Sequence, residues 1–481
     1  MRSLALLLAV ALPLDAQTPK PAANTGPLLT GLDAAAPHYA TVAKQIWSFA
    51  EVGYMEQKSS ALLQSELKAA GFNVKAGVAG EPTAFLAEYG SGKPVIAILG
   101  EFDALPGLSQ DSVPERKPLR AGGPGHGCGH HLFGTASVAA AISLKQWMQA
   151  NNVKGTLRMI GTPAEEGGAG KVYMVRDGVF NDVDAVIAWH PGDDNSVNGE
   201  RSMANISGKF RFHGVSAHAA AAPERGRSAL DAVEAMDFMT NYLREHIPDG
   251  SRIHYIITDG GKAPNVVPDE AEVYYVVRHV DMNIVKDIWN KVVNAAKGAA
   301  LGTGTTYDLQ LVGSVYSLMP NEVLAKVQQR ALETVGGYTY TAQERAFAER
   351  LQKSDAFTAV PLETTAKVKP LKIGAPGTGS TDVGDVSWVV PTVQLSAATW
   401  VPGTAAHSWQ AVAAGGTTIG YKGMMIAAKT MALTGADLFS APATIDAAKV
   451  ELATKRGPNF RYETALGAQA PQLDYRKGSV P

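Results

Sequence analysis

Three short and almost wholly apolar runs, each followed by polar side chains, place the strongest constraint on the fold. They are VIAILG at 95–100, TLRMIG at 156–161 and DAVIAWH at 184–190. Such runs predict strands buried on both faces of a sheet that helices cover. In open α/β sheets, ligands bind outside the carboxyl ends of the strands. We therefore expect one crevice to collect the polar side chains that follow these strands or lie in the loops between them: Asp103, Cys128, His130, Glu165, Glu166 and His190.

The pattern along the chain predicts an α/β fold with a second, inserted domain. Helical periodicity covers 36–71 in two segments broken near 51–53, and further helices are expected at 132–150 and 417–434. From about Ile206 the order becomes β-α-β-β-α-β, which is typical of a small ferredoxin-like domain. The expected boundaries are 17–204 and 318–440 for the main domain, 205–317 for the inserted domain and 441–481 for a C-terminal extension.

The N-terminus has the features of a secretory signal peptide. One arginine precedes the apolar run LALLLAVAL, and the small residue Ala16 precedes Gln17. The run is too short to span a bilayer comfortably, although a membrane anchor or a buried helix is the alternative. We expect residues 1–16 to be removed and a Pro-, Ala- and Thr-rich leader to extend to about Leu29. The mature protein should then be periplasmic or secreted, with no membrane span.

Composition argues against a nucleic-acid partner. Lysine and arginine number 43 and aspartate and glutamate 45, so the net charge is −2, and no basic excess is present that would attract a polyanion. A hydrophobic content of 46% in 481 residues is enough for a large core and for more than one domain. The balance is that of an ordinary globular enzyme.

The stretch GHGCGHH at 125–131 surrounds the only cysteine of the chain with three histidines. Thiolate and imidazole are good ligands for zinc and similar ions, and the glycines allow these side chains to converge. A metal would also protect a thiol that has no disulfide partner in an exported protein. Cys128 and His130 are therefore candidate ligands, whereas His126 and His131 are expected to support them by hydrogen bonding. A solvated loop is about as consistent with Cys-Gly-His alone.

The pair Glu165-Glu166 follows a predicted strand in TPAEEGGAG. Beside a metal, one carboxylate can be a ligand while its neighbour takes a proton from water and delivers it to a leaving amine. Two solvated charges are the plain alternative. His190 and His407 add two imidazoles, although each alone is equally consistent with a packed histidine.

The order of these motifs resembles that of the dinuclear metallo-amidohydrolases and carboxypeptidases. That group includes the aminoacylases, the indole-acetyl-amino-acid hydrolases and the p-aminobenzoyl-glutamate hydrolases. The resemblance covers roughly 37–438 and is carried by DALP, GHGCGHH, TPAEEGGAG, AWHPG, GVSAHAAAAPERGRSALDAV, PNVVPDEAEVYYVVR and GTAAHSW. The stretch STDVGDVSWVVPTVQ most resembles the aminobenzoyl-glutamate utilization protein B branch.

The resemblance implies a metallopeptidase-type catalytic domain that holds two divalent ions, zinc or manganese, in each subunit. The implied metal ligands are Cys128, His130, Glu166, His190 and His407. Glu165 would be the general base and acid, and Asp103 and His126 would orient ligands.

The resemblance also implies that the inserted domain acts as a lid and as the contact of a homodimer. His218 in GVSAHAA would reach the partner subunit's active site and stabilise the oxyanion of the tetrahedral intermediate. Asn265 and Arg278 would bind a substrate carboxylate. A salt bridge at the edge of a sheet is the alternative for Arg278.

The function expected from these residues is hydrolysis of an N-acyl or N-aroyl amino acid, such as a p-aminobenzoyl-glutamate-like substrate, by metal-activated water. A metallo-dipeptidase or carboxypeptidase would use the same chemistry on a short peptide with a different pocket. Two alternatives come from other classes: a cysteine hydrolase that uses Cys128, and a non-catalytic binding component of a hetero-oligomeric hydrolase.

Overall fold

The computed structural model describes residues 21–354, 360–374 and 377–478. The predicted signal peptide at 1–16 lies outside this part of the chain and stays a prediction. Among the described helices, none has the length and apolar character needed to cross a membrane.

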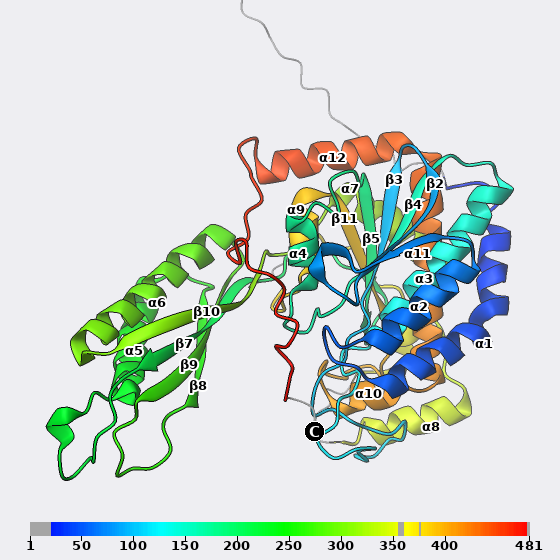
Figure 1. Ribbon diagram of the computed structural model, residues 1–481. Coiled ribbons are helices and arrows are strands. Elements are labelled where there is room, and N and C mark those ends of the chain that lie inside the picture. Colours follow the sequence, from blue (N-terminus) through cyan, green and yellow to red (C-terminus); the bar gives the residue numbers. More distant parts are fainter. Residues whose placement is uncertain (1–20, 355–359, 375–376, 479–481) are drawn as a thin grey trace, which may run out of the picture.

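The chain forms a large body around a seven-stranded sheet and a small body around a four-stranded sheet (Figure 1). In spatial order the strands of the large sheet are β1 (Asn73–Ala76), β2 (Phe85–Ser91), β4 (Gly155–Gly161), β3 (Val95–Gly100), β5 (Ala185–Gly192), β11 (Thr392–Ala398) and β6 (Ser196–Val197). The central strands β4, β3, β5 and β11 are parallel, and the outer pairings are antiparallel. The parallel centre brings the carboxyl ends of these strands to one edge of the sheet.

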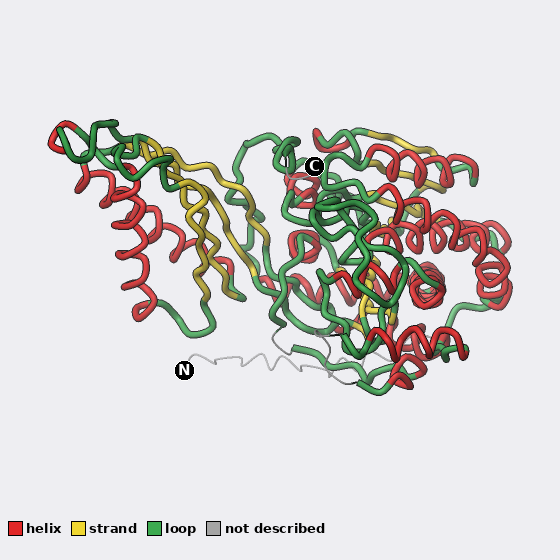
Figure 2. Tube along the Cα trace, turned by 90° about the horizontal axis from the view of Figure 1, so that it is seen from below, coloured by secondary structure: helices red, strands yellow, loops and turns green. Residues whose placement is uncertain are grey.

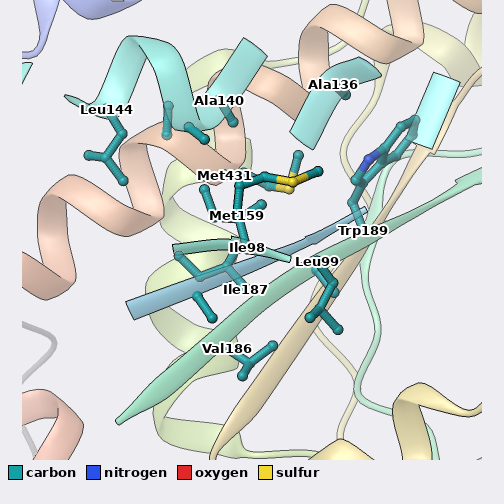
Figure 3. Close-up of a cluster of buried hydrophobic side chains, with 14 of the residues drawn as sticks. Ile98, Leu99, Ala136, Ala140, Leu144, Met159, Val186, Ile187, Trp189 and Met431 are labelled. Atoms are coloured by element: carbon teal, nitrogen blue, oxygen red, sulfur yellow. The ribbon is translucent and has the colours of Figure 1, made fainter. Parts of the chain in front are cut away.

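The large body contains the helices that cover the large sheet and others that pack on these helices. They are α1 (Gly26–Phe49), α2 (Gln57–Ala69), α3 (His130–Ala150), α4 (Gly170–Arg176), α7 (Glu322–Val335), α8 (Ala342–Leu351), α9 (Val383–Val389), α10 (Trp409–Gly415), α11 (Thr418–Ser440) and α12 (Pro442–Arg456). Ile98, Met159 and Ile187 of the strands pack against Leu144 of α3 and Met431 of α11 (Figure 3). All six residues of β3 are buried, as its apolar sequence predicts for a strand covered on both faces.

The small body follows the order β-α-β-β-α-β, so the predicted fold class is confirmed. Its elements are β7 (Ala204–His213), α5 (Ala229–Leu243), β8 (Arg252–Asp259), β9 (Glu270–His279), α6 (Met282–Thr303) and β10 (Thr306–Val315). The strands are antiparallel in the order β10-β7-β9-β8, and both helices cover one face of the sheet (Figure 2). Phe210, Tyr275 and Trp289 belong to a core separate from that of the large body.

Local structure differs from expectation at both ends of the described chain. The first helix begins at Gly26 instead of 36 and so includes residues assigned to the leader. Pro27 occupies its first turn, where a proline has no hydrogen bond to lose. The C-terminal extension contains the 15-residue helix α12, and residues 457–478 then descend between the two bodies without a helix or strand (Figure 1).

Candidate metal centre

The side chains that follow the central strands of the large sheet meet in one cavity of about 540 Å³. Glu165 and Glu166 follow β4, His190 lies near the carboxyl end of β5, and Cys128 precedes α3. The small body closes the cavity with side chains of β7 and β9. The lining includes Cys128, Glu165, Glu166, His190, His407 and Asp382 of the large body and Asn205, Ser207, Tyr274 and Arg278 of the small body.

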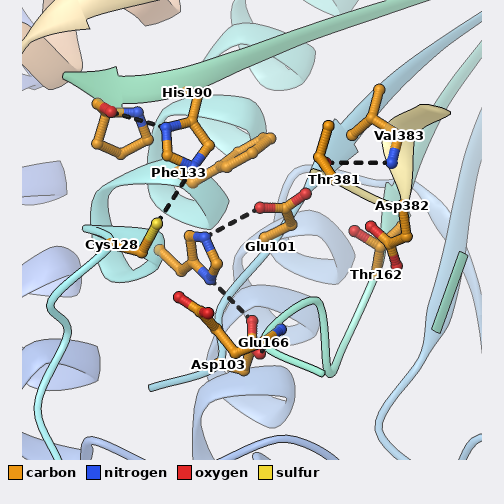
Figure 4. A network of polar contacts seen from close by, with 12 residues as sticks. Glu101, Asp103, Cys128, Phe133, Thr162, Glu166, His190, Thr381, Asp382 and Val383 are labelled. Carbon is orange, nitrogen blue, oxygen red and sulfur yellow. Dashed lines mark hydrogen bonds and ion pairs between the residues drawn. The ribbon is translucent and has the colours of Figure 1, made fainter. Parts of the chain in front are cut away.

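The five side chains expected as metal ligands form two groups that share Cys128. Cys128, His130 and His190 each place a donor atom within 4.8 Å of the others, and Cys128, Glu166 and His407 do the same. The Sγ atom of Cys128 lies 3.4 Å from Nε2 of His190 (Figure 4). A thiolate common to two groups, with imidazole and carboxylate on either side, is a donor set suited to two neighbouring divalent ions.

His130 and His190 each form a hydrogen bond through Nδ1, which leaves Nε2 of each ring as the atom that could bind a metal. His130 donates from Nδ1 to Asp103 Oδ1 over 2.8 Å, and His190 donates from Nδ1 to the Pro191 carbonyl over 2.7 Å. The Nε2 atom of His130 and Oε1 of Glu166 are buried and form no hydrogen bond within the described chain. Both atoms lie close to other side chains of the cluster, Glu101 Oε2 at 3.1 Å from His130 and His407 Nε2 at 3.4 Å from Glu166. Metal-bound histidines have this arrangement, because the second ring nitrogen fixes the tautomer. The residues therefore fit two divalent ions.

The Cys128 thiol lacks the lowered pKa that a catalytic cysteine needs. Burial raises its pKa well above the ordinary value, and the nearby Glu166 carboxylate adds to this effect. Catalytic cysteines instead have a lowered pKa, because the thiolate is the reactive form. Cys128 would become a thiolate beside a bound cation. This setting weighs against the cysteine hydrolase hypothesis.

Asp103 connects the two parts of the cluster. Its Oδ1 accepts the hydrogen bond from His130, and its Oδ2 accepts one from the backbone N–H of Glu166 over 2.8 Å. His126 and His131 belong to neither ligand group. His126 bonds the carbonyl of Ile46 over 3.1 Å, and His131 bonds that of Gly415 over 3.0 Å, so these two rings brace the loop against α1 and α10.

A buried lysine beside the cluster was not predicted from the sequence. Lys171 is fully buried, and its Nζ lies 2.7 Å from Glu101 Oε1 and 2.7 Å from Asp382 Oδ1. The other oxygen of Glu101 lies 3.1 Å from His130 Nε2. Burial, with the charges of Glu101 and Glu166, raises the pKa of Glu165 well above its ordinary value. The available signal was that Lys171 is the only charged residue in GGAGKVYMV at 167–175. A lysine buried in such an apolar stretch is almost always paired with an acidic group.

The three residues expected from the small body separate into two places. His218 and Asn265 are exposed on adjoining loops, where the N–H of Ala219 donates to the Asn265 carbonyl over 3.0 Å, and neither residue lines the cavity. Arg278 does line it and donates from Nη1 to Ser380 Oγ over 2.9 Å. Within the described chain no carboxylate forms an ion pair with this guanidinium, so the alternative of a sheet-edge salt bridge is not what the structure contains.

Comparisons with known proteins agree with this fold. The model of peptidase family M20/M25/M40 matches residues 97–411. A p-aminobenzoyl-glutamate hydrolase subunit of Escherichia coli (strain K12) is 42% identical over 427 residues, which are 83% of this chain and 89% of that protein. A Xaa-Arg dipeptidase of Mus musculus is 29% identical over 88% of this chain and 91% of its own length.

Among solved structures, an aminobenzoyl-glutamate utilization protein from Klebsiella pneumoniae has a TM-score of 0.61 at 20% identity, covering 85% of this chain and 98% of its own. A dinuclear metal-binding peptidase of family M20 from Bacillus subtilis has a TM-score of 0.57 at 17% identity, covering 85% and 99%. These two structures establish the shared fold.

Proposed function

Since the chain belongs to peptidase family M20/M25/M40, we propose that it is a metal-dependent amidohydrolase that cleaves the amide bond of N-acyl or N-aroyl amino acids. One observation carries the proposal: a single cavity is lined by Cys128, which joins the two ligand groups, by the Glu165 carboxyl and by the guanidinium of Arg278. The relatives named for hydrolysis of p-aminobenzoyl-glutamate and of indole-3-acetyl-aspartic acid support this substrate class.

Two divalent ions, zinc or manganese, would be held by Cys128, His130 and His190 and by Cys128, Glu166 and His407. Ions bound here would supply Lewis acidity for the amide carbonyl oxygen and would lower the pKa of water. Asp103 holds the ring of His130 and the backbone of Glu166 in register, so both groups of donors keep their orientation.

Glu165 is the proton carrier in this proposal. It lies next to Glu166 and lines the same cavity, where its carboxylate takes a proton from water and returns it to the leaving amine. Arg278 binds the free carboxylate of the amino-acid half, because a guanidinium without an acidic partner in the described chain can form paired hydrogen bonds with that group. Substrate is thereby oriented with its amide between the ligand groups and Glu165.

The exposed position of His218 and Asn265 is consistent with a role in a second copy of the chain. The small body exposes apolar side chains on α5 and on its edge strand β8: Phe238, Tyr242, Ile256 and Ile257, at 63, 65, 63 and 44%. An unpaired edge strand beside an apolar patch is a surface that another copy can cover. We propose a homodimer through this surface, in which His218 serves the active site of the partner and stabilises the developing oxyanion.

Two other functions have support from particular relatives. The similarity to a Xaa-Arg dipeptidase favours a dipeptidase with the same site and another pocket. The Escherichia coli relative is named as one subunit of its hydrolase, which favours a chain that works only together with a second, different chain. In the second case, the protein alone would not hydrolyse any of these amides.

The test is a hydrolysis screen with the purified protein loaded with zinc or manganese. N-acyl amino acids, N-aroyl amino acids including p-aminobenzoyl-glutamate, and dipeptides are compared by release of the free amine. We expect hydrolysis of the first two classes, loss of activity on chelation, and a loss of about 100- to 10,000-fold in Glu165→Gln, the range typical of general acid–base catalysis. Cleavage of dipeptides alone would identify the protein as a dipeptidase instead. Full turnover by Glu165→Gln would refute the assignment of the base.

A further inference from the structure

The C-terminal strap, defined as residues 457–478, reaches the proposed metal centre from outside the family match, which ends at 411. It leaves α12, crosses between the two bodies (Figure 1) and ends beside the turn that carries Glu165 and Glu166. None of the metal-binding or catalytic side chains comes from this segment, so its contacts with that turn require another explanation.

Two strap residues bind the backbone of Glu166. The hydroxyl of Tyr475 donates to the Glu166 carbonyl over 3.1 Å, and Nη2 of Arg476 donates to the same oxygen. The N–H of Glu166 is bound by Asp103 on the opposite side. The backbone N–H and the backbone carbonyl of Glu166 are therefore both fixed from outside the turn. The loop that follows β3 binds the N–H, and the strap binds the carbonyl.

The turn has a backbone conformation that outside contacts must maintain. Ala164 and Ala169 have φ angles of 57° and 54°, in the left-handed region that costs an alanine about 1–2 kcal/mol. Tyr54 donates to the carbonyl of Gly168 over 2.9 Å, and its ring meets that of Tyr475 edge-on, with centroids 5.8 Å apart. A Cβ atom added at Gly53 would collide with the Tyr475 hydroxyl and with Ala164, so the strap packs closely against a loop that itself contacts this turn.

The same strap is anchored on the small body. Gln472 and Gln469 donate from Nε2 to the carbonyl of Leu311 over 2.7 and 3.3 Å. Leu311 lies in β10 where the pairing with β7 shifts register before Gly313, and Gly313 lines the cavity. One segment thus contacts β10, a strand that lines the cavity, and the turn that carries two of its carboxylates.

We propose that the strap is a positioning element of the active site. Tyr475 and Arg476 hold the Glu166 carbonyl, and this sets the directions in which the Glu165 and Glu166 carboxylates leave the turn. The glutamine contacts with Leu311 keep the strap seated while the small body closes the cavity. The inference rests on the proposed function, because it takes Glu166 as a metal ligand and Glu165 as the base.

Metal affinity and turnover of Tyr475→Phe and Arg476→Met test the proposal. Both variants remove a donor to the Glu166 carbonyl and keep most of the side-chain volume. Tyr316→Phe is the matched control, because the Tyr316 hydroxyl also donates to a strap carbonyl, that of Glu463, over 3.0 Å. Glu463 lies far along the strap from the residues that bind Glu166. Affinity for zinc is measured by competition with a chromophoric chelator, alongside kcat, KM and the Tm of the metal-free proteins.

We expect Tyr475→Phe and Arg476→Met to weaken zinc binding by about 10-fold, within the range seen when groups that orient ligands are removed. Both variants should reduce kcat by a larger factor than the factor by which they change KM. Tyr316→Phe should match the wild type in affinity and kcat. A lower metal-free Tm with unchanged zinc affinity and kcat would overturn the proposal, since that is the result of a purely structural strap. A wild-type protein that binds no zinc would instead contradict the proposed function, so the two failures are distinguishable.

Discussion

Replacing Lys171 by methionine removes a buried ammonium that lies between two carboxylates. Its Nζ is 2.7 Å from Glu101 and 2.7 Å from Asp382, and the side chain is fully buried. At an effective dielectric constant of about 20, one such contact corresponds to an attraction of about 6 kcal/mol. Desolvation of the ions offsets much of this, and removal of one partner from a buried ion pair costs about 3–5 kcal/mol. Methionine retains the length of the side chain, so lost packing adds little.

The assay is urea-induced unfolding of the metal-free proteins, followed by tryptophan fluorescence, because Trp189 is fully buried in the core of the large body. We expect the free energy of unfolding to fall by about 3–5 kcal/mol at neutral pH. The deficit should be smaller at pH 5, because burial raises the pKa of Asp382 and the variant lacks the ammonium that opposes this. A carboxyl with a raised pKa in the folded state lowers the free energy of unfolding as the pH rises through that pKa.

Lys429→Met is the matched control, since Lys429 pairs with the largely exposed Asp33, and an exposed pair contributes about 0–1 kcal/mol. A loss in Lys171→Met no larger than that of the control would refute the reasoning. Because Glu101 also contacts His130, turnover of the lysine variant should fall as well.

Four further results are expected. Chelation should abolish hydrolysis and lower the Tm, and zinc should restore both, because a ligand that binds only the folded state stabilises it; activity that persists without metal would contradict the proposed site. Asp103→Asn should weaken zinc binding by about 10- to 100-fold in a chelator competition, since it orients His130 and the Glu166 backbone. The proposed homodimer predicts that Glu165→Gln and His218→Ala proteins, each nearly inactive, regain about a quarter of wild-type activity after subunit exchange, because half the dimers then contain one complete site; no recovery would place His218 outside the partner's site. Burial raises the pKa of Asp237 from 3.8 to about 6, and the charge of Glu234 raises it further. This carboxyl therefore lowers the free energy of unfolding as the pH rises from about 4 to 6. Asp237→Asn should raise the free energy of unfolding by up to about 3 kcal/mol at pH 8, and the gain should vanish below pH 4.

Much of the fold followed from local patterns in the sequence. The run at Val95–Gly100 was predicted residue for residue, because six consecutive apolar side chains are compatible with a strand covered on both faces. The order of elements in the small body was also predicted from its pattern. The start of α1 was wrong by ten residues, since a Pro27 in the first turn does not distinguish a helix from a leader.

The candidate ligands could be assembled because each follows a strand or lies in a short glycine-bounded loop. Strand ends of a parallel sheet converge, so Cys128, Glu166 and His190 were expected in one crevice before their distances were known. The sharing of Cys128 between two ligand groups could not be read from this pattern, since it depends on side-chain directions that only the packed loops define.

The sequence by itself determined the chemical types at the site, the strands that carry them and the presence of an inserted domain. Tertiary structure alone revealed two of the groups that support them, Lys171 and Tyr475. Lys171 meets Asp382 across 211 residues of chain, and Tyr475 meets Glu166 across 309. Local periodicity contains no information on such pairs, because a hydrogen bond or ion pair depends on distance in space, and the packing of the whole chain sets that distance.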